Sequence, residues 1–493
     1  MRLHYILGGK SELTARLHSV VAVWLTAWII SGIGTRLHNR RTGLIAGVVW
    51  LTTLQVLVHG RLCVADMPLL LFLTLAARAL LELLWLGTDK RWGLWFWVLY
   101  LSLGLGFLAK GPLALLVPAL AVVLSRWIGR TPLPWARLQL FPGLAFTLLI
   151  VAAWGIPALV ETHGLFWKVG MGEHVVKRGT EVLNGRAFLP LIYYPLTSVL
   201  SLFPWIGVAW PVWLYAKRHW DSGTIFLLGW LAAPYVIFSF YATQLPHYVM
   251  PAFPAAALLV ARWLASIQHQ DVFTPKFMQV LCSFWGLLGA GLVVFSQVLP
   301  PNAVSHIIIW LGVLLIILAI IGYFATRIIV YPRPMTGIMV MLLSFGLTVE
   351  QLGWTLRETN ATLKVAVGTR YLPSTTAYLG WDYTEPSLVF YTGHPWEFTG
   401  KTEKVIQFLQ QNPQALVTAL EREWTLGGWF KAKFAGTPPE TPTRDQSEKV
   451  MAVQKRFPQL QSRFAQGINI ARMSWVEVRV MEQRPESVNA DLR

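Results

Sequence analysis

The chain has 493 residues, of which 55% are hydrophobic and only 13% charged, and its mean hydropathy is +0.51. These values exclude an ordinary soluble protein and indicate a polytopic α-helical membrane protein. The net charge of +17 does not indicate nucleic-acid binding, because the Lys and Arg residues fall in short clusters between apolar runs.

Apolar stretches long enough to cross a bilayer as helices recur over the first 356 residues. The positively charged loops between them alternate with loops that carry little positive charge, and we expect the positive set in the cytoplasm. Asp66, Lys110 and His247 then share the outer side of the membrane. The expected spans, about twelve in number, are residues 19–35, 43–59, 68–86, 92–109, 111–127, 143–162, 189–216, 223–241, 249–267, 277–300, 306–326 and 336–356.

The composition changes after residue 356 to mixed charge with amphipathic patterns. We predict a transmembrane domain over residues 1–356 and a small outer α/β domain over residues 357–493. Within that domain we predict a buried strand over 386–393, a helix over 402–413 and a second strand over 414–420.

Asp66 stands in "GRLCVADMPLLLFLTL", at the outer end of an expected span. A carboxylate there is costly unless it is solvated, paired or used, so it is a candidate functional residue. Two structural alternatives remain open. Asp66 could pair with Arg61, or it could cap the helix that starts at Met67 and Pro68. Arg78 and Glu82, four positions apart on the same span, predict a structural ion pair.

Two further polar residues stand at helix breaks on the outer side. Lys110, in "GFLAKGPLALLVP", is suited to bind a lipid phosphate, although a snorkelling lysine would look the same. His247, in "ATQLPHYVMPAFP", could bind phosphate or a metal, shuttle a proton, or only make an interfacial hydrogen bond. The long loop around Glu173, His174 and Arg178 is either a binding element or a contact for anionic headgroups.

Five segments, taken in order, resemble the GT-C glycosyltransferases of the protein mannosyltransferase type (glycosyltransferase family 39-like), especially the lipid A 4-amino-4-deoxy-L-arabinose transferases. The resemblance covers nearly the whole chain. The segments are "SELTARLHSVVAVWLTAWII", "RLCVADMPLLLFLTL", "GFLAKGP", "TQLPHYVMPAFPAAALL" and "EPSLVFYTGHP".

The resemblance implies transfer of a sugar, with inversion, from a polyprenyl phosphate donor to a lipid A-like or other envelope acceptor. The reaction would take place at the periplasmic face of a bacterial inner membrane. Asp66 matches an acidic residue of the second outer loop and is the expected catalytic residue. Lys110 matches a phosphate-binding lysine. A divalent metal ion is left open by the resemblance, with His247 as its candidate ligand.

The remaining candidates are less closely matched. Gln244 stands where relatives have a lysine, which removes one positive charge from the expected phosphate site. The donor-phosphate candidates are Lys110, His247, Tyr248 and Gln244. The candidate contacts for the acceptor or for the donor are Arg61, Glu173, His174 and Arg178.

Relatives have one span more, and their first outer loop carries the principal catalytic acid. Residues 1–12 resemble the run that follows this loop, so we expect the first helix and the first outer loop to be missing from this chain. That expectation agrees with the outward N-terminus required by the charge pattern, and it would make Asp66 a supporting acid rather than the main catalytic acid. Two other functions stay open: a non-catalytic remnant that binds the lipid carrier, and a secondary transporter or flippase.

Overall fold

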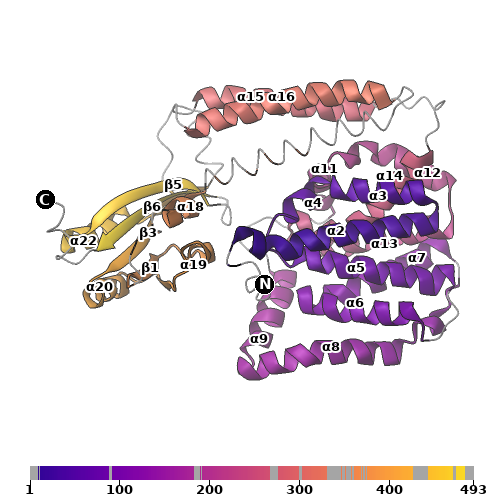
Figure 1. Cartoon of the computed structure of the whole chain (residues 1–493), viewed down its shortest axis with the longest axis horizontal. Coiled ribbons are helices and arrows are strands. Elements are labelled where there is room, and N and C mark those ends of the chain that lie inside the picture. The colour runs from indigo at the N-terminus through magenta and orange to yellow at the C-terminus, as the bar shows by residue number, and fades with distance from the viewer. Residues whose placement is uncertain are drawn as a thin grey trace. The chain divides into compact units, whose positions relative to one another are not determined.

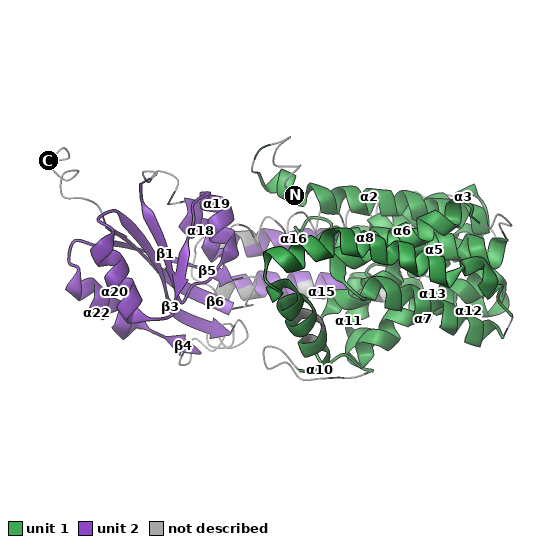
Figure 2. Cartoon of the chain, turned by 90° about the horizontal axis from the view of Figure 1, so that it is seen from below, with its two compact units in different colours: residues 1–283, 321–349 green, residues 284–320, 350–493 purple. Residues whose placement is uncertain are grey.

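The computed structural model divides into two compact units (Figure 2), residues 1–283 with 321–349 and residues 284–320 with 350–493. The predicted domain boundary at residue 356 stays a prediction. The structure describes residues 9, 11–87, 92–130, 132–181, 189, 191–266, 276–298, 303–329, 346, 350, 353, 357, 360–367, 369, 372, 375–425, 442–469 and 474–483.

The first unit is built of apolar helices (Figure 1). Its longer helices are α2 (Glu12–Leu37), α3 (Arg40–Leu51), α4 (Leu54–His59), α5 (Asp66–Leu81), α6 (Leu94–Lys110), α7 (Leu113–Gly129), α8 (Leu140–Glu161), α11 (Tyr193–Ser201), α12 (Ala209–Arg218), α13 (Ser222–Ser239) and α14 (Phe253–Ser266). Short helical turns are η1 (Glu82–Leu86), η2 (Trp135–Leu138), α9 (Leu165–Trp167), η3 (Lys168–Lys177), α10 (Arg178–Thr180), η5 (Trp205–Val208) and η6 (Pro246–Ala252). Two more long helices, α15 (Lys276–Val298) and α16 (Ala303–Ile329), follow, and residues 284–320 of this stretch belong to the second unit.

The first eleven expected spans all coincide with helices of the described residues. Five of these helical segments are long and apolar enough to cross a membrane, and a bent pair with an angle of 109°, α11 with η5 and α12, makes a sixth. The twelfth expected span, 336–356, lies almost wholly outside the described residues. The chain is therefore a multi-pass membrane protein of helices, as its composition predicts.

The expected single span over 43–59 is wrong in one respect, because the helix breaks at Thr52 and Thr53. Both hydroxyl groups donate to carbonyl groups one turn earlier in α3, at 2.6 Å and 2.8 Å. The amide of Leu54 then donates to the carbonyl of Phe203 at 2.9 Å, outside its own helix. Such side-chain bonds compete with regular helix geometry. The break produces the short helix α4, which ends at His59.

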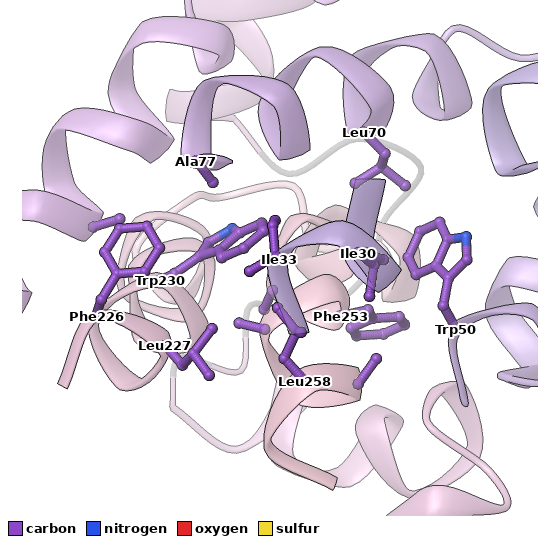
Figure 3. Packing of buried hydrophobic residues seen from close by; sticks show 14 of the residues in the cluster. Ile30, Ile33, Trp50, Leu70, Ala77, Phe226, Leu227, Trp230, Phe253 and Leu258 are labelled. Carbon is purple, nitrogen blue, oxygen red and sulfur yellow. The ribbon is translucent and has the colours of Figure 1, made fainter. Parts of the chain in front are cut away.

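The core of the first unit consists of large side chains from helices distant in sequence (Figure 3). Ile30 and Trp50 are fully buried, and the indole nitrogen of Trp50 donates to the carbonyl of Val23 at 3.0 Å. Small residues let the helices approach. A Cβ atom on Gly43 would lie 2.2 Å from the Thr35 hydroxyl of α2. This close packing is typical of membrane helices, where apolar burial alone gives little driving force.

The predicted ion pair between Arg78 and Glu82 is confirmed, with 2.7 Å between nitrogen and oxygen. The Glu82 side chain is only 3% exposed and also contacts Arg36 of α2 at 3.4 Å. Arg78 in turn donates to the carbonyl of Gly32 at 3.1 Å. The charged cluster thus ties α5 to α2, which supports its structural interpretation.

The second unit contains a six-stranded sheet with helices on both faces. Its order is β2-β1-β3-β6-β5, with β4 on β3; β1 is parallel to β2 and β3, whereas β6 is antiparallel to β3 and β5. The strands are β1 (Ala377–Trp381), β2 (Glu397–Thr399), β3 (Ala415–Thr425), β4 (Arg444–Asp445), β5 (Gln461–Asn469) and β6 (Ser474–Gln483). The helices are α18 (Ala361–Val367), α19 (Pro386–Thr392), α20 (Thr402–Gln411) and α22 (Ser447–Arg456).

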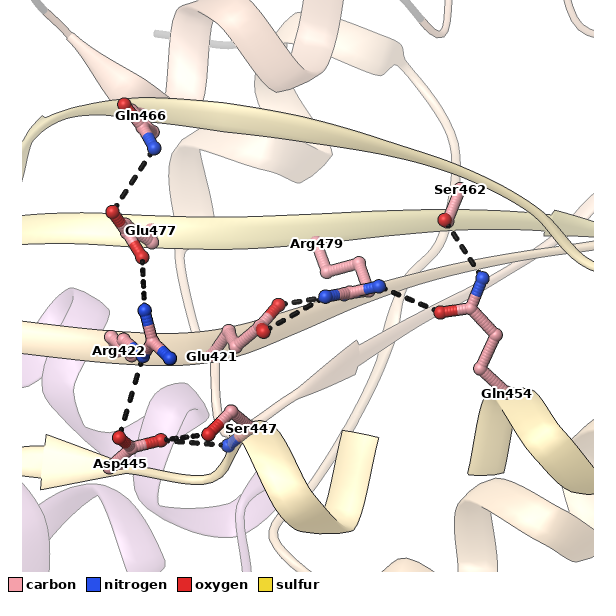
Figure 4. Close-up of polar contacts among 9 residues, drawn as sticks. All are labelled: Glu421, Arg422, Asp445, Ser447, Gln454, Ser462, Gln466, Glu477 and Arg479. Atoms are coloured by element: carbon pink, nitrogen blue, oxygen red, sulfur yellow. Dashed lines mark hydrogen bonds and ion pairs between the residues drawn. The ribbon is translucent and has the colours of Figure 1, made fainter. Parts of the chain in front are cut away.

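Side-chain alternation along β3 explains the two covered faces. Val417 faces a cluster that includes residues of α20 and α22, whereas Leu416 faces a cluster that includes residues of α18 and α19. A buried ion pair joins the strands, since Arg479 of β6 contacts Glu421 of β3 at 2.7 Å and 2.9 Å (Figure 4). The predicted α/β organisation is confirmed.

One predicted element of this unit is wrong. Residues 386–393 are not a strand, because 386–392 form the helix α19. Pro386 occupies its first turn, where proline is favourable, and Gly393 ends it at φ 74° in the left-handed region. The helix predicted over 402–413 and the strand predicted over 414–420 are confirmed as α20 and β3.

Candidate functional site

Asp66 and Lys110 form an ion pair between the start of α5 and the end of α6. These helices pack side by side (Figure 1), and α6 ends at Lys110 because Gly111 follows with φ 74°. The Asp66 side chain is 14% exposed and that of Lys110 is 27% exposed. The capping alternative is wrong, since α5 begins at Asp66 itself and Ala65 is the capping residue. The pair is thus a partly buried carboxylate next to an ammonium group.

His247 and Tyr248 complete a small pocket around this pair. The pocket is lined by Asp66, Lys110, His247 and Tyr248 together with apolar residues of α5, α7, α13 and η6. The Lys110 ammonium lies 5.6 Å from the centre of the Tyr248 ring. Pro246 starts η6, and its ring fixes the backbone angle φ directly before His247. His247 then lies in the pocket wall. Four residues predicted from three separate segments therefore converge.

His59 is a residue of this site that sequence reasoning missed. It ends α4, is 9% exposed, and its ring centre lies 5.0 Å from that of His247. Its Nδ1 atom is 3.0 Å from the side-chain amide nitrogen of Gln55, one helical turn earlier. The available signal was a pair of polar residues, Gln55 and His59, four positions apart in an expected span.

The other predicted site residues lie elsewhere or are not described. The Gln244 amide is buried and bonded to the backbone, accepting from Leu189 at 3.0 Å, and it is not among the residues that line the pocket. Arg61 and Glu173 are exposed. The side chains of His174 and Arg178 lie outside the described residues. Their predicted roles stay predictions.

An apolar cavity of about 740 Å³ lies in the same unit. Its wall includes Tyr235 of α13 and Phe253 of α14, close in sequence to Phe238 and Pro251 of the polar pocket. The cavity is also lined by Ile128, near the C-terminal end of α7. Leu113, which lines the polar pocket, is at the N-terminal end of the same helix. At 1.5 Å per residue these two positions are about 22 Å apart along the helix. The wall of the apolar cavity thus begins within a few positions of the charged pocket on α13 and α14 and includes a residue at the far end of α7.

Lys110 is the positively charged group that an anion entering the pocket would meet. Lys110 and Asp66 balance each other, and Asp66 also interacts electrostatically with His247 and His59. An entering phosphate would compete with Asp66 for Lys110 and gain a charge-assisted hydrogen bond. Among the described residues, no three His, Cys, Asp or Glu side chains are arranged to hold a metal ion. A metal role of His247 gains no support from this arrangement and stays a prediction.

Residues 1–156 match the family model described as dolichyl-phosphate-mannose-protein mannosyltransferase. The undecaprenyl phosphate-alpha-4-amino-4-deoxy-L-arabinose arabinosyl transferase of Enterobacter sp. (strain 638) is 28% identical over 349 residues, which cover 66% of this chain and 60% of that protein. The transferase of the same name from Erwinia tasmaniensis is 30% identical over 323 residues, or 61% of this chain and 54% of that protein. The alignments thus span three fifths or less of these two relatives.

The crystal structure of ArnT from Cupriavidus metallidurans bound to undecaprenyl phosphate has the same fold. Its TM-score is 0.74 at 18% sequence identity, with 97% of this chain and 86% of that chain covered. The apo structure of the same protein gives a TM-score of 0.73 at 17% identity. The resemblance to the GT-C glycosyltransferases is confirmed by these similarities, which establish a helical membrane fold with a small C-terminal sheet domain.

Proposed function

We propose that this chain, which has the GT-C fold of ArnT and a first third matching the mannosyltransferase family model, is an inverting membrane glycosyltransferase. Its donor would be a sugar linked to a polyprenyl phosphate such as undecaprenyl phosphate. Its acceptor would be lipid A or another envelope glycolipid. The names of the relatives support a pentose as the sugar.

The observation that carries the proposal is a charged pocket beside an apolar cavity. A polyprenyl phosphate sugar has a charged head and a long apolar tail. In the proposed complex, Lys110 binds the phosphate and the tail enters the cavity lined by Tyr235 and Phe253. A soluble sugar nucleotide would have no use for an apolar cavity of about 740 Å³. A charged pocket with an apolar cavity next to it therefore favours a lipid-linked donor.

The chemistry follows from the ion pair. In the inverting reaction an acceptor hydroxyl oxygen bonds to the anomeric carbon while the bond from that carbon to the phosphate oxygen breaks. The bonding electrons leave with the lipid phosphate, whose new negative charge Lys110 stabilises. Donor binding draws Lys110 away from Asp66, and the released carboxylate accepts the hydroxyl proton. Asp66 is thus the proposed catalytic residue of this chain, with Lys110, His247 and Tyr248 around the phosphate.

The orientation follows from the charge of the loops. Since positively charged loops stay in the cytoplasm, Asp66, Lys110 and His247 would face the periplasm of a bacterial inner membrane. The C-terminal α/β domain would lie on the same side. The exposed residues Arg61 and Glu173 are then proposed contacts for the acceptor or for the sugar, as are His174 and Arg178.

The test is transfer in proteoliposomes that contain the full chain, undecaprenyl phosphate-linked aminoarabinose and lipid A. We expect modified lipid A and free undecaprenyl phosphate in equal amounts, and we expect Lys110→Ala to abolish both. Lys404→Ala is the matched control, because that lysine is exposed on α20, outside the proposed binding residues. If the chain bound undecaprenyl phosphate but transferred no sugar, the result would favour the alternative, a non-catalytic protein that binds the lipid carrier. If the chain showed no binding and no transfer, the proposed function would be refuted.

A further inference from the structure

The second unit contains a pocket of its own, between α18 and β5. The pocket has a volume of about 480 Å³ and is lined by Lys364 of α18, by residues 463–466 of β5 and by Val480 of β6. Ala465 and Val480 are buried and give the pocket an apolar floor. A volume of this size lies within the range of small-molecule sites, so the pocket has room for a sugar rather than for a single ion.

The pocket exists because α18 covers only part of β5. This helix has seven residues, and it packs on the strand through a cluster that includes Val365 and Ala465. The first four residues of the strand, 461–464, are exposed. Successive side chains of a strand point to opposite faces, so Arg463 lies on the same face as Ala465. The start of β5 therefore leaves a space beside the helix, with Arg463 at its border.

Lys364 brings a second positive charge to this space. Its ammonium group donates to the backbone carbonyl of Gln466 at 2.9 Å, a contact that orders the lysine without neutralising its charge. The acidic residue of β6 on the same face is Glu482, which does not line the pocket. The side chains of Arg463 and Lys364 thus make the border of the pocket basic.

Arg463 differs from the other strand arginines of the sheet. Three of these form ion pairs with carboxylates, two of which are drawn in Figure 4: Arg422, Arg444 and Arg479. Within the described part of the chain, Arg463 has no hydrogen bond or ion pair. A cation on an edge strand can also serve to prevent sheets from pairing, which is the structural alternative. That alternative explains neither the pocket nor the second cation, Lys364, from another element.

We propose that the pocket between α18 and β5 binds the phosphate-bearing sugar headgroup of an acidic glycolipid. Arg463 and Lys364 contact the phosphate, and the sugar lies over the floor of Ala465 and Val480. The planar guanidinium group can bond to two phosphate oxygens, whereas the ammonium group adds a point charge. The inference rests on the proposed function, in which the acceptor is lipid A or another envelope glycolipid. It assigns to the second unit a site for the acceptor, distinct from the donor site around Lys110.

A double variant removes both charges from the pocket: Lys364→Gln with Arg463→Gln. Its matched control, Lys404→Gln with Arg456→Gln, removes the same charge from exposed positions on α20 and α22, which cover the opposite face of the sheet. We expect the pocket variant to bind lipid A about tenfold more weakly than the wild type, because two charge-assisted contacts are lost. The control should bind lipid A as the wild type does. Neither variant should change the Kd for undecaprenyl phosphate.

The experiment measures the Kd of the purified full chain in detergent for lipid A, for dephosphorylated lipid A and for phosphatidylglycerol. We expect the wild type and the control to prefer lipid A about tenfold over both other lipids, and the pocket variant to lose this preference. Equal binding of dephosphorylated lipid A would show that the phosphate is not recognised. Equal binding of phosphatidylglycerol would show that any phospholipid headgroup suffices. Either result overturns the inference.

The proposed function is judged by a separate measurement on the same samples, the Kd for undecaprenyl phosphate. A pocket variant that keeps the wild-type Kd for lipid A refutes the inference, and so does a wild type that binds no lipid A. In both cases the proposed donor site stands if undecaprenyl phosphate still binds. If the double variant does not fold, Arg463→Gln alone decides, because it changes one exposed side chain.

Discussion

Lys110 and Asp66, 44 positions apart in the chain, form an ion pair where the end of α6 lies next to the start of the antiparallel helix α5. The pair gives the pocket a lysine that is already ordered and a carboxylate that is already ionised. A lipid phosphate that takes over Lys110 leaves Asp66 without its partner. Binding of the donor and release of the base are therefore coupled through one ammonium group.

Asp66→Asn should separate binding from catalysis. Without the competing carboxylate, Lys110 is free for the phosphate, so we expect the Kd for undecaprenyl phosphate to fall by up to about tenfold. Transfer should fall by about 100-fold or more, because the proton acceptor is lost. Both are measured on the purified full chain, with Glu161→Gln on the exposed end of α8 as the control. Weaker binding together with unchanged transfer would contradict the proposed coupling.

The apolar cavity should recognise the tail of the carrier. Ala256 lines the cavity, and Ala256→Phe would fill part of it. We expect this variant to bind undecaprenyl phosphate more weakly, by about tenfold, because about two methylene groups lose their burial at about 0.8 kcal/mol each. A short-chain prenyl phosphate should bind the variant and the wild type equally. Equal losses for both ligands would mean that the variant disturbs the charged pocket instead.

Close packing of α8 on α6 depends on Gly143. A Cβ atom there would lie 2.0 Å from the ring of Tyr100, whose hydroxyl is held by the carbonyl of Leu138 at 2.7 Å. Gly143→Ala should therefore lower the free energy of unfolding by about 1–3 kcal/mol. On the same helix, a Cβ atom on Gly155 would meet no heavy atom within 4 Å. Gly155→Ala should be neutral or slightly stabilising, and equal effects in thermal unfolding would contradict this packing.

The second unit should lose stability in acid through Asp445. Hydrogen bonds from Ser447 to this largely exposed carboxylate lower its pKa below the ordinary value of 3.8, and Arg422 adds to the effect. A lowered folded-state pKa gives stability that is present above the unfolded pKa and lost as the pH falls through the folded pKa. Ser447→Ala should thus destabilise the unit at pH 7, and this cost should shrink progressively as the pH falls below 3.8. Unfolding of the full chain, followed from pH 7 into this acid range, provides the measurement, and a cost that stays constant with pH would contradict it.

The convergence of Asp66, Lys110 and His247 could be predicted from the sequence, because helix parity puts all three on one side of the membrane. The contact of Asp66 with Lys110 could not, since it depends on which helices are neighbours. His59 was missed because the break at Thr52 and Thr53, which creates α4, is encoded by side-chain bonds to the backbone rather than by hydropathy. Residues 386–393 were also mispredicted from hydropathy, because a short apolar run fits either a strand or a helix. The signals for a helix are Pro386 in its first turn and Gly393 at its end.

The most direct test of the lipid-phosphate site is the Kd of the purified full chain for undecaprenyl phosphate, compared between the wild type, Lys110→Ala and Lys404→Ala. Lys110→Ala loses a charge-assisted hydrogen bond to the phosphate, so its affinity should fall about 10- to 100-fold. Lys404→Ala, on the exposed side of α20, should bind as the wild type does. Equal affinities of the wild type and Lys110→Ala would show that the pocket around Asp66 and Lys110 does not hold the phosphate.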